Sequence, residues 1–164
     1  MKILIVSDTH GYDTRFRKLF KLESPVDLVL HAGDFQGSEE LYGMFTGLTP
    51  FLGVAGNNDF SGIFPDTRII PACDHQIFLA HGHQHHVHST LQLLTEEASR
   101  RGADIALFGH THRAEITEED HILCINPGSL TYPRGGNGLP TYVILTLTEG
   151  HRPDCEIRTL PAGF

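Results

Sequence analysis

The sequence contains few cysteine, methionine and basic residues, and it has no tryptophan. Its 164 residues include three cysteines, two methionines and 12 Lys and Arg, against 20 Asp and Glu. Cys73, Cys124 and Cys155 are scattered and form no Cys-x-x-Cys pair, which argues against a disulfide framework and a thiolate zinc site. We expect these cysteines to be buried as small apolar residues.

Two further absences restrict the partners of the protein. No run of about 18 apolar residues occurs, so no membrane partner is expected. The formal net charge of −8 argues against stable binding of nucleic acid through a basic surface. The apolar run at residues 2–6 is too short for a signal peptide, and a cytoplasmic location is the simplest interpretation.

Short apolar runs alternate with amphipathic segments in the first two thirds of the chain. This alternation predicts parallel strands joined by helical crossovers, followed by antiparallel strands in the last third. We expect one α/β sandwich domain over residues 1–164, because this length suits a single core. The predicted strands are residues 2–6, 26–30, 50–54, 76–80, 104–108, 114–118, 122–125, 141–148 and 155–160, and the predicted helices are residues 12–22, 39–48 and 89–101, with Ser38 as an N-cap.

Histidine is frequent, with 12 residues, and five apolar runs end in a cluster of metal-competent side chains. Ligand sites lie beyond the carboxyl ends of parallel strands, so these clusters can converge. We expect Asp-x-His and His-x-His to place two ligands on one side of an extended segment. Glycines within the clusters should allow close approach of the side chains. The clusters are residues 7–10, 31–34, 55–59, 81–83 and 109–112.

Taken in order, these motifs resemble those of the calcineurin-like metallophosphoesterase superfamily, in its small prokaryotic phosphodiesterase branch. The resemblance extends from about residue 2 to about residue 148, and residues 126–129 resemble a turn of that branch. It implies a four-layer α/β/β/α sandwich with two mixed β-sheets and a two-metal centre. By motif position, one metal ion would be held by Asp8, His10 and His112, the other by Asn57, His81 and His110, and both by the bridging Asp34.

The resemblance also implies a reaction. Two divalent ions bring four positive charges against two negative ones from Asp8 and Asp34, so the centre would attract a phosphate. The ions would lower the pKa of a bridging water, and the resulting hydroxide would attack phosphorus in line. Mixed imidazole, carboxylate and amide ligands favour transition metals, with Mn first and Ni, Co, Fe or Zn as alternatives.

One position departs from the pattern of many phosphatases in the superfamily. They carry His directly after the Asn ligand as the acid for the leaving group, and this chain has Asn58 there. An amide cannot supply that proton, and loss of a general acid typically costs about 10²–10⁴ in rate. We therefore expect a small phosphodiester or activated phosphate ester as substrate, with Asn58 as a contact and His83 as an alternative proton donor.

Several residues have two interpretations from sequence alone. Arg134 either binds a substrate phosphate or braces a Gly-rich turn, and Asp59 either orients a ligand or caps a turn. His31 is expected to form buried hydrogen bonds behind the ligands. A solvated loop is expected for His85, His86 and His88, and surface positions for His75, His121 and His151.

A second function also fits the resemblance. One retromer subunit of this fold serves mainly in assembly, so a protein-binding scaffold with little or no catalysis is the alternative. The branch that contains this subunit has substitutions among the ligand positions, whereas this chain has all seven, which favours catalysis. Formation of a homo-oligomer stays open, because no heptad or interface strip is visible in the sequence.

Overall fold

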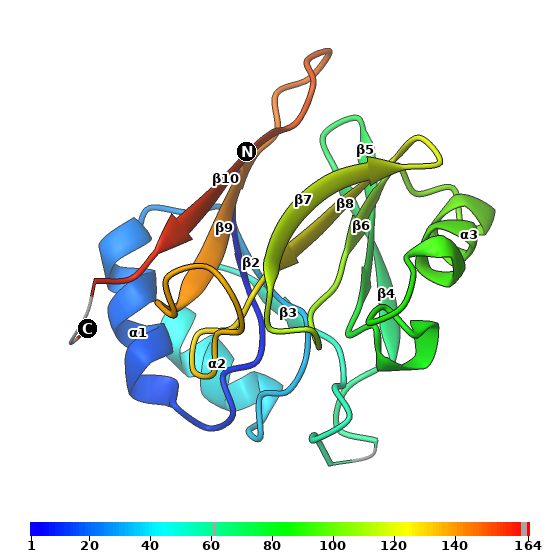
Figure 1. Cartoon of the computed structure of the whole chain (residues 1–164). Coiled ribbons are helices and arrows are strands. Elements are labelled where there is room, and N and C mark those ends of the chain that lie inside the picture. The colour runs from blue at the N-terminus through cyan, green and yellow to red at the C-terminus, as the bar shows by residue number, and fades with distance from the viewer. Residues whose placement is uncertain (61, 162–163) are drawn as a thin grey trace.

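The computed structural model describes residues 1–60, 62–161 and 164. Two five-stranded β-sheets pack face to face, and helices cover the outer face of each sheet (Figure 1). The predicted α/β fold with two mixed sheets is therefore confirmed. The elements are β1 (Lys2–Val6), α1 (Asp13–Glu23), β2 (Leu28–His31), α2 (Glu39–Thr46), β3 (Phe51–Gly53), β4 (Thr67–Ala72), β5 (His75–Ala80), a 3₁₀ turn (His83–His85), α3 (Gln92–Arg100), β6 (Ile105–Leu107), β7 (Ala114–Glu119), β8 (Ile122–Pro127), β9 (Thr141–Thr146) and β10 (Asp154–Thr159).

Each sheet has parallel strands at its centre. The first sheet has the order β10-β9-β1-β2-β3, in which β1, β2 and β3 are parallel and β9 and β10 are antiparallel additions. The second has the order β4-β5-β6-β8-β7, in which β5, β6 and β8 are parallel. The open edges β10 and β7 lie on the same side of the sandwich (Figure 1).

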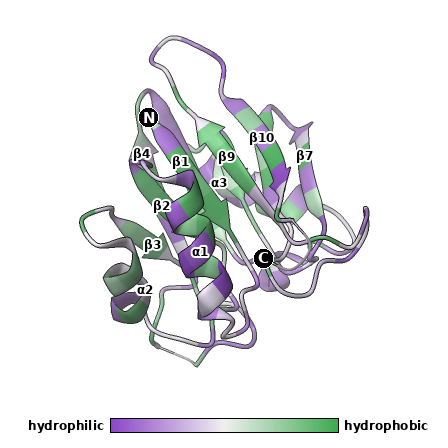
Figure 2. Cartoon of the chain, turned by 90° about the vertical axis from the view of Figure 1, so that its left-hand side faces the viewer, coloured by the Kyte–Doolittle hydropathy of each residue, from purple (hydrophilic) through white to green (hydrophobic). Residues whose placement is uncertain are grey.

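Three apolar clusters hold the four layers together. In β1, Ile3 and Ile5 point into the cluster between the sheets, whereas Leu4 and Val6 pack with Phe16 of α1. A third cluster joins the second sheet to α3. Figure 2 shows α1 in front of the first sheet, with apolar strands behind it. Both faces of β1 are therefore buried, as is usual for parallel strands between layers.

The structure corrects several expectations for the elements. Strand β4 was not predicted, because Pro71 interrupts its pattern, but β4 is an edge strand and tolerates proline. Strand β8 is antiparallel to β7, as expected, but it is parallel to β6 on its other side. Helix α2 ends at Thr46, before Gly47 at a φ of 63°, while its N-cap is Ser38, as predicted.

Other sequence-based expectations concern burial and the membrane. Cys124 is buried as expected, but Cys73 is exposed and Cys155 is half-buried. The described helices include none with the length and apolar character of a membrane span.

Candidate metal centre

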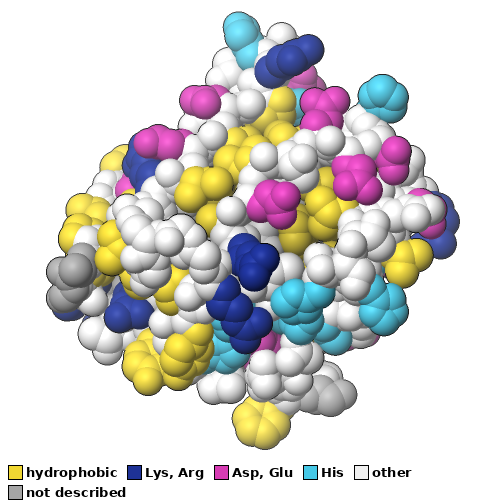
Figure 3. All heavy atoms as spheres, viewed as in Figure 1, with side chains coloured by type: hydrophobic (Ala, Val, Ile, Leu, Met, Phe, Trp, Pro, Cys, Tyr) yellow, Lys and Arg dark blue, Asp and Glu magenta, His cyan; other side chains and the backbone are white. Residues whose placement is uncertain are grey.

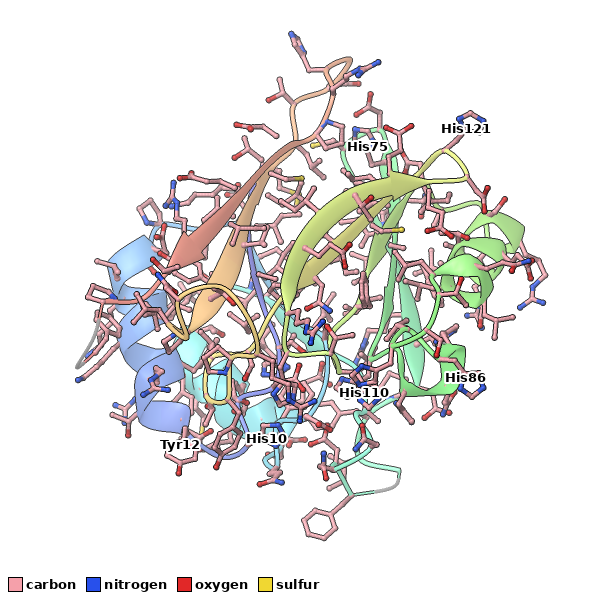
Figure 4. All side chains as sticks on the ribbon, viewed as in Figure 1. His10, Tyr12, His75, His86, His110 and His121 are labelled. Atoms are coloured by element: carbon pink, nitrogen blue, oxygen red, sulfur yellow. The ribbon has the colours of Figure 1, made fainter. Side chains whose placement is uncertain are left out.

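The seven predicted ligands follow strands β1, β2, β3, β5 and β6 at one end of the sandwich. The ligand atoms of Asp8, His10, Asp34 and His112 all lie within 4.8 Å of one another. His81 Nε2 is 3.5 Å from Asp34 Oδ2. The ring of His110 lies 5.1 Å from that of His81, between centroids. Figure 4 shows His10 and His110 at this end of the molecule, far from His75 and His121 at the other.

The backbone at this centre differs from the expectation. The two ligand pairs were expected to lie on extended segments, but both pairs lie in turns after the strands end. A non-glycine residue in the left-handed region costs about 1–2 kcal/mol, so surrounding contacts must hold these turns. Backbone hydrogen bonds do so from Asp8 N to Gly33 O (3.0 Å) and from His10 N to Asp34 O (2.9 Å). Five of the seven predicted ligands have positive φ, namely Asp8 (54°), His10 (47°), Asp34 (58°), His110 (66°) and His112 (59°).

His112 and Asp8 face each other closely, and against the effect of burial the contact with Asp8 raises the pKa of His112. In the neutral form of His112 the two facing atoms are both hydrogen-bond acceptors. His112 Nδ1 donates to the carbonyl oxygen of Tyr132 (2.7 Å), so Nε2 of the neutral ring carries a lone pair. That Nε2 lies 2.9 Å from Asp8 Oδ1. Among the described residues, Asp8 Oδ1 and His10 Nε2 are buried and have no hydrogen-bond partner. These atoms therefore suit a bound cation.

His81 repeats this arrangement on the other side of Asp34. Its Nδ1 donates to the carbonyl oxygen of Ala32 (2.6 Å), which leaves the lone pair on Nε2. This nitrogen faces Asn57 Oδ1 at 3.2 Å and Asp34 Oδ2 at 3.5 Å. Three acceptor atoms thus converge, and a cation fits this set as well.

Asp34 lies between the two groups of acceptors. Its Oδ2 is 3.8 Å from His10 Nε2 and 3.5 Å from His81 Nε2. Asn58 holds the carboxylate, because its backbone N–H donates to Oδ1 (2.8 Å) and its side-chain amide donates to Oδ2 (2.7 Å). One carboxylate is therefore within reach of both groups.

The protonation of Asp8 and His110 also favours cation binding, whereas a cation must compete with a proton at His112, whose pKa the contact with Asp8 raises. Burial by itself would raise the pKa of Asp8, but contacts with His112 and the charge of His81 hold it below the ordinary value. Burial, aided by His81 and His88, lowers the pKa of His110 to about 4. Asp8 is thus an anion and His110 a neutral ring near pH 7, the forms in which both bind metal.

Several buried polar residues that sequence reasoning did not select hold the ligands in place. Ser7 Oγ donates to Asp8 Oδ2 (2.6 Å), and Ser129 Oγ donates to the carbonyl oxygen of Asp8 (2.9 Å). His31, as predicted, forms buried hydrogen bonds, with Thr9 Oγ1 and the N–H of Gly33. Burial lowers the pKa of His31 to about 3, so its ring stays neutral.

Asp59 supports the loop that carries Asp34. Its Oδ2 accepts hydrogen bonds from the backbone N–H groups of Asp34 (2.8 Å) and Gly56 (2.8 Å), and its Oδ1 accepts one from Gln36 (2.7 Å). Both interpretations of Asp59 therefore hold, because Asp59 orients Asp34 by capping the turns around it.

We expect Asp59→Asn to loosen this loop, because an amide replaces one acceptor oxygen by a donor that faces backbone N–H groups. The free energy of unfolding should fall by about 1–3 kcal/mol, and the Mn²⁺ affinity should fall about 10–100-fold. Urea unfolding and Mn²⁺ titration measure the two effects. Asp154→Asn, at an exposed position on β10, is the control. Unchanged Mn²⁺ affinity in Asp59→Asn would contradict this role.

A pocket of about 230 Å³ lies over the candidate ligands. Asn58 and Arg134, both considered for substrate binding, line this pocket. His83 does not line the pocket, although its ring lies 5.4 Å from that of His81. His88 lines the pocket, and its ring lies 4.7 Å from that of His110. Sequence reasoning missed His88 because its neighbour His110 is distant in the chain.

The remaining histidines occupy different environments. His85 is buried and lies 2.8 Å from Glu97 of α3, so a solvated loop was the wrong expectation for it. His86 is exposed, as expected. His75 is half-buried and paired with Asp104, which raises its pKa, whereas His121 and His151 are on the surface.

Known proteins share this sequence pattern over most of the chain. The calcineurin-like phosphoesterase superfamily domain matches residues 1–150. The probable metallophosphoesterase YsnB of Bacillus subtilis is 38% identical over 148 residues, which are 90% of this chain and 85% of that protein. The phosphodiesterase MJ0936 of Methanocaldococcus jannaschii is 30% identical, with 88% of this chain and 92% of that protein covered.

Solved structures share the fold as well. A protein of Streptococcus pneumoniae TIGR4, described as a predicted phosphoesterase, superposes with a TM-score of 0.84 at 27% identity, over 96% of this chain and 88% of that one. Vacuolar Protein Sorting 29 of Cryptosporidium parvum superposes with a TM-score of 0.81 at 23% identity, over 99% and 93%. The second similarity concerns the fold alone. From the domain match, the relatives and the ligand geometry together, the chain belongs to the calcineurin-like phosphoesterase superfamily.

Proposed function

We propose that this protein is a phosphodiesterase that depends on two divalent transition-metal ions, Mn²⁺ foremost. The convergence of acceptor atoms on both sides of Asp34 supports this proposal most directly. The identity to a relative named a phosphodiesterase is further support. An acidic chain of net charge −8 also needs bound cations to attract an anionic ester to this end of the sandwich.

The residues divide into ligands and substrate contacts. Asp8, His10 and His112 would hold one ion, Asn57, His81 and His110 the other, and Asp34 both. Bound divalent ions supply Lewis acidity and lower the pKa of a coordinated water. Arg134, with the planar fork of a guanidinium, is positioned to bind phosphoryl oxygens in the pocket.

The leaving group limits the choice of substrate. Asn58 donates its amide to Asp34 and has no proton to give to a leaving oxygen. His83, the donor considered from sequence, is near His81 but does not line the pocket, whereas His88 does. We expect esters with good leaving groups to react fastest, and we propose His88 beside His83 as a candidate proton donor for poorer ones.

Removal and return of metal tests this function. The protein is stripped with a chelator, and Mn, Ni, Co, Zn or Mg is restored singly before assay of bis(p-nitrophenyl) phosphate and p-nitrophenyl phosphate. We expect activity to return with a transition metal and the diester to react faster than the monoester. Failure of every metal to restore hydrolysis would contradict the proposal and favour the scaffold alternative. A faster monoester would contradict the diester preference alone.

A further inference from the structure

A second and larger groove adjoins the candidate metal centre. It has a volume of about 560 Å³ and lies where the edge strands β10 and β7 approach each other. Figure 3 shows the same face, where basic side chains separate the histidines from an apolar strip bordered by acidic groups. The lining residues come from three segments: residues 112–114 at the start of β7, residues 133–139, and the strand pair β9–β10.

The groove lies next to the pocket over the metal ligands. His112 and Arg134 line both. The segment between them is tied to the ligand itself, because Arg134 N donates to the carbonyl oxygen of His112 (2.8 Å) and His112 Nδ1 donates to that of Tyr132 (2.7 Å). A molecule with its phosphate over the ligands would therefore have the groove directly beside it, on the far side of Arg134.

Size distinguishes the two compartments. The pocket over the ligands, at about 230 Å³, is smaller than the roughly 300–1,000 Å³ usual for sites that enclose an organic ligand. The groove, at about 560 Å³, lies within that range. The first compartment suits the phosphate, and the second suits a substituent attached to it.

The lining of the groove indicates which substituent fits. Ile157, Leu139 and Pro133 provide an apolar wall, while Thr141 and Thr159 provide hydroxyl groups. None of the described residues that line the groove is acidic, which disfavours a cationic group. A mixed lining of this kind suits a ring with polar edges better than an alkyl chain.

Two arginines at the mouth of the groove are available to a ligand. The ion pairs of arginines in the described residues involve Arg68, Arg100, Arg101 and Arg158. Arg113 and Arg134 take part in none of them and line the groove. A guanidinium stacks on flat rings and binds anionic oxygens. A poor leaving group needs a proton, and a guanidinium cannot release one near neutral pH. The groove beside these arginines therefore suits the substituent that stays on phosphorus.

We propose that this groove binds the retained ester substituent of the substrate, and that this substituent is a ring-bearing group of nucleoside size. The inference rests on the proposed phosphodiesterase function. It adds a specificity site that the metal ligands do not contain. The side chains of Thr141, Thr159 and Asn137 would contact the polar edges of the group. Arg113 or Arg134 would contact its phosphate or its ring face.

Two diesters with one leaving group test the groove. Thymidine 5′-(p-nitrophenyl phosphate) and methyl p-nitrophenyl phosphate differ only in the retained substituent. With the Mn-restored protein, kcat/KM should be higher for the nucleoside ester, mainly through a lower KM. Ile157→Asn and Leu139→Asn should each reduce the ratio of the two kcat/KM values about tenfold. Leu93→Asn on α3 is the matched control, because Leu93 and Ile157 are 44% and 40% exposed.

The outcomes separate this proposal from the proposed function. Equal kcat/KM for the two diesters in the unchanged protein, or the same ratio in both groove variants, would overturn the groove assignment while leaving the phosphodiesterase intact. If neither diester reacts, the phosphodiesterase proposal fails, and calorimetric titration of the nucleoside ester into the Mn-loaded protein decides the groove. The groove assignment is supported if the nucleoside ester binds and if Ile157→Asn, but not Leu93→Asn, weakens this binding. Absence of binding would overturn the groove assignment.

Discussion

Asp34→Asn should lower kcat/KM for bis(p-nitrophenyl) phosphate by about 10³-fold, because in the proposed centre several kcal/mol of transition-state stabilisation would depend on the metal pair, and each 1.36 kcal/mol is tenfold in rate. Asp34 Oδ2 is the atom within 3.8 Å of His10 Nε2 and 3.5 Å of His81 Nε2. Asparagine has nearly the same shape but only one oxygen and no charge, so it cannot bridge two cations. Steady-state kinetics after Mn restoration measures this loss.

The metal content of this variant gives a second readout. Elemental analysis should find fewer bound ions in Asp34→Asn than in the unchanged protein. Asp154→Asn removes an equal charge from an exposed position on β10 and should alter neither activity nor metal content. Retention of full activity and of both ions by Asp34→Asn would show that no carboxylate bridge is needed.

Gly56→Ala should disrupt the centre without changing any ligand. A Cβ at position 56 would lie less than 3.0 Å from Oδ1 and from the backbone nitrogen of Asp34. The backbone atom cannot rotate away, so the Asp34 loop must shift. We expect a loss of about 1–3 kcal/mol in unfolding free energy, and a fall of about 10²-fold in activity, the usual effect of a 1 Å misplacement. Urea unfolding and diester kinetics measure the two.

Gly43→Ala is the matched control for this substitution. Gly43 lies within α2, and a Cβ there would meet no atom within 4 Å. Alanine is the better helix former, so this variant should be more stable by about 0.5–1 kcal/mol with unchanged activity. Normal metal binding and kinetics in Gly56→Ala would show that the loop moves at no cost to the ligands.

The gathering of the predicted ligands at one end of the sandwich could be expected from the sequence, because its signal is positional. Asp8, Asp34 and His81 each follow an apolar strand of β1, β2 or β5, and parallel strands bring their carboxyl ends to one edge. Order along the chain and strand length were enough to group these side chains. The reason given for the spacing of Asp8 and His10 was nevertheless wrong. Both residues lie in left-handed turns, and no local preference of Asp or His reveals such a conformation, because distant hydrogen bonds hold it.

The supporting contacts could not be predicted in the same way. Ser129 and Asp8 are 121 residues apart in the chain, and His88 and His110 meet across two loops. Neither pair leaves a periodic pattern in the sequence. Strand β4 was missed for a related reason, because the tolerance for Pro71 depends on the strand lying at an edge, which is a property of the whole sheet.

The sequence by itself determined the α/β class, through hydrophobic periodicity, and the metal-competent side chains and the family, through the order of the motifs. Only the tertiary structure decided which acceptor atoms face one another, which histidine reaches the pocket, and where a groove adjoins it. These features depend on distances of a few ångströms between segments that are far apart in the sequence, and no local sequence pattern sets such distances. Packing of the two sheets, with the turns that it holds, sets those distances.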